Sequence, residues 1–237
     1  MSRPDPRARA RLAGLLYLAS GLPAGFSIFV YQRMMVRGDA AATAANILGS
    51  ETLFRAGFVA DLAGIVLFLA AVLVLHEVLR PAGRTTAVLM AGFGFLGATI
   101  QSLDCLGDIT ALLFLKGGKV MESFTVAQTQ ALAFQVLKWH VLLYDVAFVY
   151  FGVFCLLVGT LVLRSTFLPR VLGAFMLVDG LGYLFFGVTT FLAPPLSLRL
   201  YPVLPFATAA LGEASLMLWL IVKAVDARRW EEQAAAA

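Results

Sequence analysis

Charged residues are scarce in this sequence. Asp, Glu, Lys and Arg together make up only 14% of the 237 residues, whereas 61% are hydrophobic and the mean hydropathy is +0.89. A soluble domain needs enough polar side chains to cover its surface, and its charged residues stay exposed to water. The composition therefore excludes a soluble globular domain and indicates a polytopic membrane protein.

The sequence also has few residues of the kinds that perform catalysis. It contains two cysteines and two histidines, and no P-loop, GxSxG, Rossmann glycine, HExxH or CxxC pattern. Cys105 and Cys155 both fall within apolar stretches, where a thiol is ordinarily a packing residue and a disulfide is weakly supported. The net charge of +4 forms no patch typical of nucleic-acid binding. No catalytic residue, metal or cofactor can be assigned from these patterns, and a role other than catalysis is favoured.

Six apolar stretches are each long enough to cross a hydrocarbon core of roughly 30 Å, which takes about 20 helical residues. Runs such as LAGIVLFLAAVLVL lack the alternation of membrane-barrel strands, so helices are expected. We predict an all-α fold, a single six-transmembrane-helix bundle over residues 1–237. The spans are expected at about 12–30, 53–79, 85–115, 141–163, 171–192 and 203–225.

The distribution of Lys and Arg predicts the orientation. An even number of spans places both termini on one side, which carries eleven basic residues, while the other side carries seven. Basic residues concentrate on the cytoplasmic side of a membrane, so both termini are expected in the cytoplasm and the membrane is expected to be the inner one. The long connection 31–52 is then an outer-face loop. Its Ala-rich segment GDAAATAANILGSE predicts a short helix, which could be a rigid connector or a lid.

Two acidic residues are expected near the middle of the membrane. Asp179 lies nine residues after Arg170, and Glu213 lies ten residues before Lys223, which is roughly 14–15 Å of helix in each case. No Lys, Arg or His is expected at that depth, and an ionised side chain there costs roughly 3 kcal/mol or more. The pair is therefore predicted to be protonated, to share a proton, or to bind a cation or a polar ligand. A neutral acid that only joins two helices is the structural alternative.

A second set of polar residues is expected near the outer interface. Asp104 and Asp108 are four residues apart on one helix face, and His140 comes four residues before Tyr144. These side chains could converge on a metal ion or a proton path, although acids and aromatic residues are also ordinary at a membrane interface. The full outer polar layer is predicted to contain Asp61, Asp104, Asp108, His140, Tyr144 and Asp145.

Small residues predict where the helices approach one another. Gly21 and Gly25 form a GxxxG pattern, and Gly92, Gly94 and Gly97 give the third span a smooth face. Because lipid offers no hydrophobic drive to association, such sites serve close backbone contact between spans. We expect these glycines to be helix-packing positions.

Longer sequence blocks carry a resemblance to a known family. The chain resembles the bacterial integral-membrane family catalogued as domain of unknown function 4386 in the opening ARLAGLLYL, the segment GDAAATAANILGSETLFRAGFVADL, the block LLYDVAFVYFGVFCLLVGTLVLRSTFLPRVLGAFMLVDGLGYL and the ending LGEASLMLWLIVKAVD. The resemblance extends over nearly the whole chain. It implies a six-span bundle in a bacterial membrane and places Glu213 in the family's closing motif. It carries no established activity.

Three functions remain open at this point. The first is a small-molecule, proton or cation binding or transport-like bundle built around the mid-membrane carboxyl pair. The second is a non-catalytic accessory or scaffold protein with a membrane-protein partner, which glycine-rich helix faces would suit. The third is an intramembrane metal-dependent hydrolase that uses the outer polar layer. Membrane lipid is an expected partner in every case.

Overall fold

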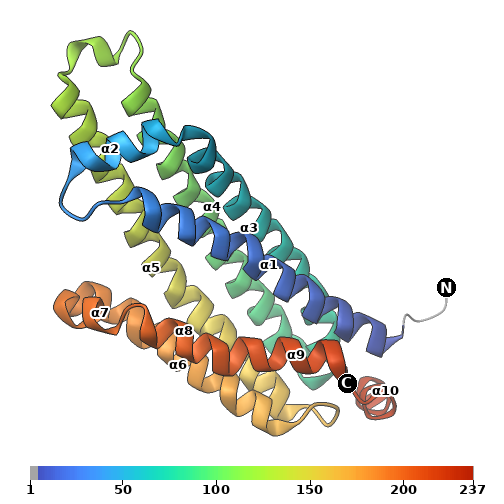
Figure 1. The fold of residues 1–237 in the computed structure, drawn as a ribbon. Helices are drawn as coiled ribbons and strands as arrows, with labels where there is room; N and C mark the ends of the chain where they lie inside the picture. The colour runs from blue at the N-terminus through green and yellow to red at the C-terminus, as the bar shows by residue number, and fades with distance from the viewer. Residues whose placement is uncertain (1–4, 237) are drawn as a thin grey trace. The chain divides into compact units, whose positions relative to one another are not determined.

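The computed structural model describes residues 5–236, and over this range the chain is helical with no strand (Figure 1). Six helices are long and apolar enough to cross a membrane. The predicted all-α, multi-pass membrane protein with six spans is therefore confirmed. The first five spans are α1 (Pro6–Met34), α3 (Glu51–Leu79), α4 (Arg84–Lys116), α5 (Val126–Arg164) and α6 (Arg170–Leu192), and the sixth is a composite of α8 (Val203–Ala209), η3 (Ala210–Ala214) and α9 (Ser215–Val222).

Shorter helices occupy the connections and the carboxyl end. In the 31–52 connection, α2 (Ala40–Gly49) begins after Asp39, whose side chain accepts a hydrogen bond from the Ala42 backbone N–H at 2.8 Å. Such a cap satisfies one of the amide groups that the first turn of a helix leaves free. The other short elements are η1 (Arg80–Ala82), η2 (Met121–Ser123), α7 (Pro194–Leu200) and α10 (Ala227–Ala236).

The helix α5 begins well before the apolar stretch that starts at residue 141. Its start is fixed by a reciprocal cap, in which the Thr125 backbone N–H donates to Gln128 Oε1 at 2.8 Å and the Gln128 backbone N–H donates to Thr125 Oγ1 at 3.3 Å. With 39 residues, α5 is about 58 Å long. This length exceeds a hydrocarbon core of roughly 30 Å, so part of the helix lies outside the apolar region.

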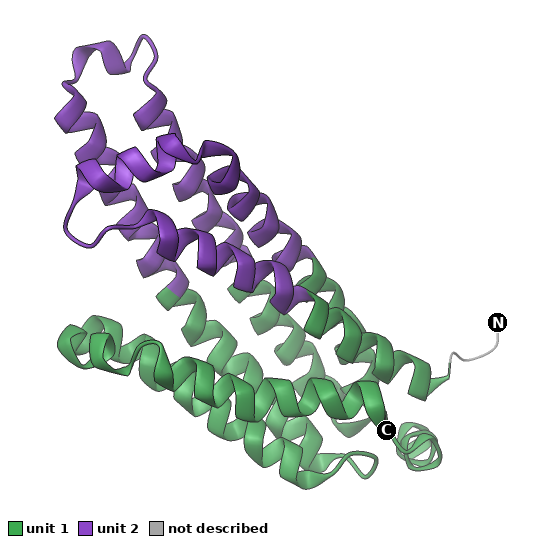
Figure 2. Ribbon diagram, in the orientation of Figure 1, with its two compact units in different colours: residues 1–19, 67–98, 145–237 green, residues 20–66, 99–144 purple. Residues whose placement is uncertain are grey.

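The chain forms two compact units, and α1, α3, α4 and α5 contribute residues to both (Figure 2). The predicted mid-membrane pair, Asp179 and Glu213, belongs to unit 1. The predicted outer-layer residues belong to unit 2, except Asp145, which belongs to unit 1. Unit 1 comprises residues 1–19, 67–98 and 145–237, and unit 2 comprises residues 20–66 and 99–144.

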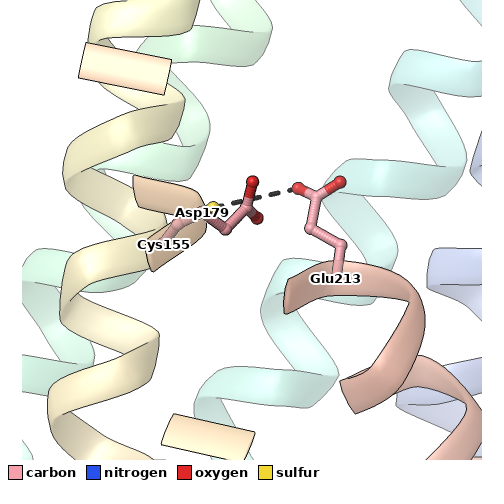
Figure 3. A group of neighbouring side chains, drawn as sticks. All are labelled: Cys155, Asp179 and Glu213. Atoms are coloured by element: carbon pink, nitrogen blue, oxygen red, sulfur yellow. Dashed lines mark hydrogen bonds between the residues drawn. The ribbon is translucent and has the colours of Figure 1, made fainter. Parts of the chain in front are cut away.

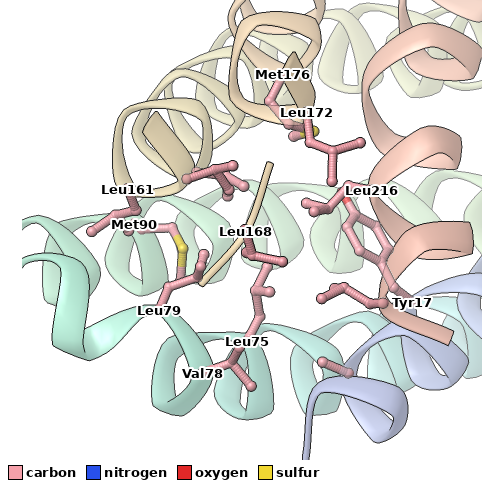
Figure 4. Close-up of a cluster of buried hydrophobic side chains, with 14 of the residues drawn as sticks. Tyr17, Leu75, Val78, Leu79, Met90, Leu161, Leu168, Leu172, Met176 and Leu216 are labelled. Atoms are coloured by element: carbon pink, nitrogen blue, oxygen red, sulfur yellow. The ribbon is translucent and has the colours of Figure 1, made fainter. Parts of the chain in front are cut away.

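The core of unit 1 is a cluster of buried apolar side chains from α1, α3, α4, α5, α6 and α9 (Figure 4). Lipid chains are as apolar as these side chains, so their burial inside a bundle gains little from the hydrophobic effect, and close packing supplies the attraction. Tyr17 is a member of this cluster and brings a hydroxyl group into it. The largest fully buried members are Leu75, Leu79, Met90, Phe154, Leu161, Met176, Leu216 and Leu220.

Four glycines bring α5 and α6 into backbone contact along unit 1. A Cβ atom built on Gly180 would lie 2.7 Å from the Gly152 carbonyl oxygen, and one built on Gly173 would lie 2.8 Å from the Gly159 carbonyl oxygen. The contacts are reciprocal and repeat after seven residues on both helices, as in heptad packing. Only glycine fits, because the obstructing atoms belong to the backbone. We call these four glycines the α5–α6 seam.

Several glycines singled out from the sequence do not act as packing positions. Within residues 5–236, no heavy atom of another segment lies within 4 Å of a Cβ atom built on Gly21, Gly25 or Gly92, and all three are exposed. The prediction for these three is wrong, because a GxxxG spacing shows that two glycines share a face but not what that face meets. At Gly97 the prediction holds, since a Cβ atom would lie 2.6 Å from the Phe151 ring.

The helix α10 is anchored within unit 1 by Trp230. The indole N–H donates to the Val78 carbonyl oxygen at 2.8 Å, near the end of α3, where carbonyl groups begin to lack helical partners. We predict that Trp230→Phe, which keeps an aromatic ring and removes the donor, weakens this contact by about 1 kcal/mol. Amide hydrogen exchange in α10 should then be about fivefold faster. The control Trp139→Phe, at an exposed position on α5, should leave that exchange unchanged, and equal exchange in both variants would contradict the prediction.

Candidate functional site

Two glycines set the distance between α6 and the sixth span. A Cβ atom built on Gly212 would lie 2.6 Å from the Asp179 Cβ atom, and one built on Gly182 would lie 2.6 Å from the Thr208 side chain. The two helices therefore approach closely beside Asp179. Because Glu213 directly follows Gly212, the same approach brings the Glu213 side chain to Asp179.

Glu213 lies in η3, a π-helical turn between α8 and α9. A π turn has i→i+5 hydrogen bonds and fits an extra residue into the helix, which changes the direction of the side chains around it. Such turns are rare in proteins as a whole, but they often occur at functional sites. In this protein the turn coincides with the only carboxyl side chain of the sixth span.

Three side chains from three helical segments meet beside this turn (Figure 3). They are Cys155 from α5, Asp179 from α6 and Glu213 from η3. The thiol sulfur and one oxygen of each carboxyl group all lie within 4.8 Å of one another. Cys155 and Asp179 are 0% exposed, and Glu213 is half-buried. We call this group the carboxyl–thiol cluster.

Two tyrosines hold the Glu213 carboxyl group. The Tyr17 hydroxyl donates to Oε1 at 2.7 Å, and the Tyr183 hydroxyl donates to Oε2 at 3.3 Å. The Cys155 thiol also points at Oε1, at 3.8 Å. The Tyr17 ring is fixed by an edge-on contact with Phe68, with 5.6 Å between ring centroids. Each Glu213 oxygen therefore has a phenol donor, which is a strong interaction where the surroundings are apolar.

Asp179 has the opposite environment. Both of its carboxyl oxygens are buried, and neither accepts a hydrogen bond from the residues that the structure describes. The Thr208 hydroxyl and the Cys155 thiol are its polar neighbours, but the hydroxyl donates to the Pro205 carbonyl oxygen and the thiol points at Glu213. A buried polar group without a partner costs roughly 1–3 kcal/mol, and more when it is charged. The Asp179 oxygens are therefore the unsatisfied part of the cluster.

The electrostatics of the cluster favour an added positive charge. Within residues 5–236, neither Asp179 nor Glu213 forms an ion pair. Two negative charges within 4.8 Å of each other repel by about 3 kcal/mol or more at an effective dielectric constant of about 20. A proton or a cation between the two carboxyl groups would remove this repulsion and give Asp179 a partner.

The donor atoms suit two kinds of occupant. A proton needs only the two carboxyl groups, which can share it. One thiolate sulfur and two carboxylate oxygens also suit a divalent transition-metal ion such as Zn²⁺ or Co²⁺. Zn²⁺ bonds of about 2.0–2.3 Å would hold these donors about 3.5 Å apart, so the three groups would have to close by about 1 Å around the ion.

One protein family matches the chain over most of its length. The model of the family described as Domain of unknown function (DUF4386) matches residues 12–224. The chain belongs to this family. No curated protein and no solved structure matches the chain. Membership in DUF4386 confirms the resemblance seen in the sequence and assigns no reaction, so the function must be argued from the site.

The DUF4386 fold brings together the two carboxyl groups that the sequence placed at one depth, and it adds three side chains that sequence reasoning missed. A signal for Cys155 was present, because nine residues separate it from the arginine that ends α5, the same spacing that separates Asp179 from the arginine that begins α6. Tyr183 follows Asp179 by one helical turn, so both lie on one face. Tyr17 has no comparable signal, because its contact with Glu213 joins residues far apart in the sequence.

Unit 2 of this DUF4386 protein contains a second buried polar group. His140 Nδ1 lies 3.2 Å from Asp104 Oδ1 and 3.6 Å from Asp108 Oδ1. The imidazole ring stacks on Tyr31 with 4.7 Å between centroids, and the Tyr144 ring lies 6.5 Å away. The structure thus brings four of the predicted outer-layer residues together. We call Asp104, Asp108 and His140 the acid–histidine cluster.

Of the other two predicted outer-layer residues, Asp61 lies close enough to Asp108 for their charges to interact, whereas Asp145 belongs to unit 1. In unit 2, the Cys105 thiol donates to Asp61 Oδ2 at 3.4 Å. In unit 1, Asp145 has Thr190 as a polar neighbour. The Asp145 carbonyl oxygen would lie 3.1 Å from a Cβ atom built on Gly187, one heptad beyond the α5–α6 seam. The backbone of Asp145 therefore belongs to the helix contact, and its role in a polar layer stays a prediction.

Proposed function

We propose that this DUF4386 protein binds a cation, either a proton or a divalent metal ion, at the carboxyl–thiol cluster, and that the bundle is a binding or transport-like protein for that cation. A single observation carries the proposal. Two carboxyl groups and a thiol lie within 4.8 Å, and neither carboxyl group forms an ion pair among the described residues. Ionisable side chains are costly inside a membrane span, and they commonly mark ion pathways and proton relays.

The unequal hydrogen bonding of the two carboxyl groups supports this function. Glu213 has two phenol donors, so it can hold a negative charge, whereas the Asp179 oxygens accept no hydrogen bond from the described residues. A cation would give the Asp179 oxygens a partner without displacing the tyrosines from Glu213.

We also propose that the protein lies in the inner membrane of a bacterium with both termini in the cytoplasm. The charge distribution supports this orientation, because eleven of the 18 Lys and Arg residues fall on the side of the termini. One of the eleven, Arg3, lies outside the described residues. A cation at the carboxyl–thiol cluster would then reach the cytoplasm over about half the thickness of the membrane.

A Co²⁺ titration of the full-length protein in lipid nanodiscs, after removal of metals by chelation, tests the cation site. A thiolate bound to Co²⁺ gives a charge-transfer absorption that oxygen ligands do not give. We expect one Co²⁺ per chain with this absorption, displacement by Zn²⁺, and release of protons on binding. Cys155→Ser should remove the absorption. Glu231→Gln, which changes an exposed carboxyl group on α10, is the control and should bind as the unaltered protein does.

A proton occupant would give a different result in the same preparation. Co²⁺ would not bind at the cluster, but infrared difference spectra would show a protonated carboxyl group that titrates over the physiological pH range and is absent in Asp179→Asn. If no metal binds and no carboxyl group titrates, the two acids only join helices. The proposal then fails, and an accessory or scaffold role with a membrane-protein partner is favoured.

The acid–histidine cluster supports a second candidate, an intramembrane metal-dependent hydrolase. The His140 Nδ1 atom lies 3.2 Å from one carboxylate oxygen and 3.6 Å from another, and imidazole and carboxylate groups are typical ligands of a catalytic zinc ion. Elemental analysis of the gently purified protein separates the candidates. Metal lost in His140→Ala and retained in Glu213→Gln would assign it to the acid–histidine cluster. Metal lost only in Glu213→Gln would assign the metal to the carboxyl–thiol cluster and exclude the hydrolase function.

A further inference from the structure

Unit 1 contains a cavity near the ends of its helices, among residues that the cation site does not use. Its volume is about 480 Å³, and its walls come from the first turns of α1, the loop between α5 and α6, the end of α9 and the start of α10. This volume is in the range of about 300–1,000 Å³ that is typical of ligand pockets. The charged side chains that line it are Arg7, Arg11, Lys223, Arg229 and Asp226.

Most of the positive charge around this cavity is not compensated. Arg229 lies beside the one acidic residue, with 3.6 Å between its Nε atom and Asp226 Oδ2. Arg7, Arg11 and Lys223 form no ion pair within residues 5–236. Two side chains from α1 and one from the residue that caps α9 thus place unpaired positive charges around one cavity. Such a concentration of charge attracts an anion.

The other walls of the cavity are apolar. Phe167 and Leu168, in the loop between α5 and α6, are buried at 4% and 6% exposure. Trp219 lines the cavity near the end of α9, and tryptophan is enriched where a span leaves the hydrocarbon region. The cavity therefore offers cations beside an apolar surface. This combination matches a ligand with an anionic head and an apolar part.

We propose that this cavity binds the phosphate group of an anionic phospholipid. Arg7, Arg11 and Lys223 contact the phosphate, and the glycerol and first acyl carbons pack against Trp219 and Phe167. Basic pockets between spans are a recurring mode of lipid head-group recognition. A soluble phosphate ester shares the anionic group but lacks the apolar part. The site is independent of the proposed cation binding, because the two sites have no residue in common.

The test measures binding of phosphatidylglycerol to the delipidated full-length protein by native mass spectrometry. We compare two variants that lose the same charge: Arg7→Gln/Arg11→Gln/Lys223→Gln in the cavity, and Arg80→Gln/Arg84→Gln/Arg228→Gln at exposed positions that do not line it. The cavity variant should bind phosphatidylglycerol at least about tenfold more weakly, since each cation at a membrane surface contributes about 1 kcal/mol. The matched variant should change the affinity less than about threefold. The single change Lys223→Gln, at an exposed side chain, is measured as well and guards against a folding defect in the triple variant.

Two further ligands identify the source of the phosphate. Phosphatidylcholine should not compete with phosphatidylglycerol, and glycerol 3-phosphate should compete only weakly because it lacks acyl chains. Competition by glycerol 3-phosphate at concentrations equal to those of the lipid would instead assign the cavity to a soluble phosphate ester. Equal losses of affinity in the two triple variants would show that phosphatidylglycerol binding depends only on the overall charge of the protein, and this would overturn the proposal. Unchanged affinity in the cavity variant would overturn it as well.

Discussion

Gly180→Ala is expected to destabilise the protein by about 3 kcal/mol, and the double change Gly173→Ala/Gly180→Ala is expected to prevent folding. A methyl group at Gly180 would lie 2.7 Å from the Gly152 carbonyl oxygen and 2.8 Å from the Leu156 backbone nitrogen. Both atoms are backbone, so no side-chain rotation can relieve the overlap and α5 must move away from α6. The midpoint of thermal unfolding in detergent, followed by circular dichroism, measures the effect.

The control for the seam is Gly92→Ala. No atom of another segment lies within 4 Å of a Cβ atom at Gly92 among the described residues, and alanine is about 1 kcal/mol more favourable than glycine inside a helix. This variant should therefore unfold at the same temperature as the unaltered protein or at a higher one. If Gly180→Ala and Gly92→Ala unfold at the same temperature, the seam does not hold α5 and α6 together.

Glu213→Gln and Asp179→Asn are each expected to weaken Co²⁺ binding at least about 100-fold. Removing one charged partner from a buried cluster costs about 3 kcal/mol or more, and each 1.4 kcal/mol is about a tenfold change in affinity. Tyr17→Phe should have a smaller effect of about tenfold, because it removes one hydrogen bond to a carboxylate. Isothermal titration calorimetry in nanodiscs gives the affinities.

The same variants should keep the fold. Without a cation, neutral amides remove the repulsion between two buried carboxylates, so Glu213→Gln should unfold at a temperature equal to or above that of the metal-free unaltered protein. Loss of binding together with a stable fold therefore separates a site from a structural contact. Unaltered Co²⁺ affinity in a folded Glu213→Gln variant would show that this carboxyl group does not bind the cation.

The spans could be predicted because their signal is local. A membrane-crossing helix must satisfy its backbone hydrogen bonds internally and present about 20 apolar residues to lipid, and both requirements can be read from a single window of sequence. The similar level of Asp179 and Glu213 could be predicted in the same way, since it follows from the rise per residue counted from Arg170 and Lys223. The same count places Cys155 at that level, because nine residues separate it from the arginine that ends α5.

The packing contacts could not be predicted, because they depend on pairs of segments. The sequence contains 21 glycines, and nothing in a single helix distinguishes Gly180, which meets another backbone, from Gly21, which is exposed. The π turn at Glu213 has no local signature either. Gly212 in this turn lies against Asp179 of α6, and that contact cannot be read from the sequence of the turn.

The sequence by itself determined that this DUF4386 protein is a helical, six-span membrane protein and that two acids lie at similar depth, because hydropathy and helical rise are properties of one segment at a time. The tertiary structure decided which acids meet, which donors surround them and which glycines allow the approach. These features arise from contacts between residues that are far apart in the chain, such as Tyr17 and Glu213. Physically, the apolar environment selects each span separately, whereas close packing selects only pairs of helices whose shapes fit.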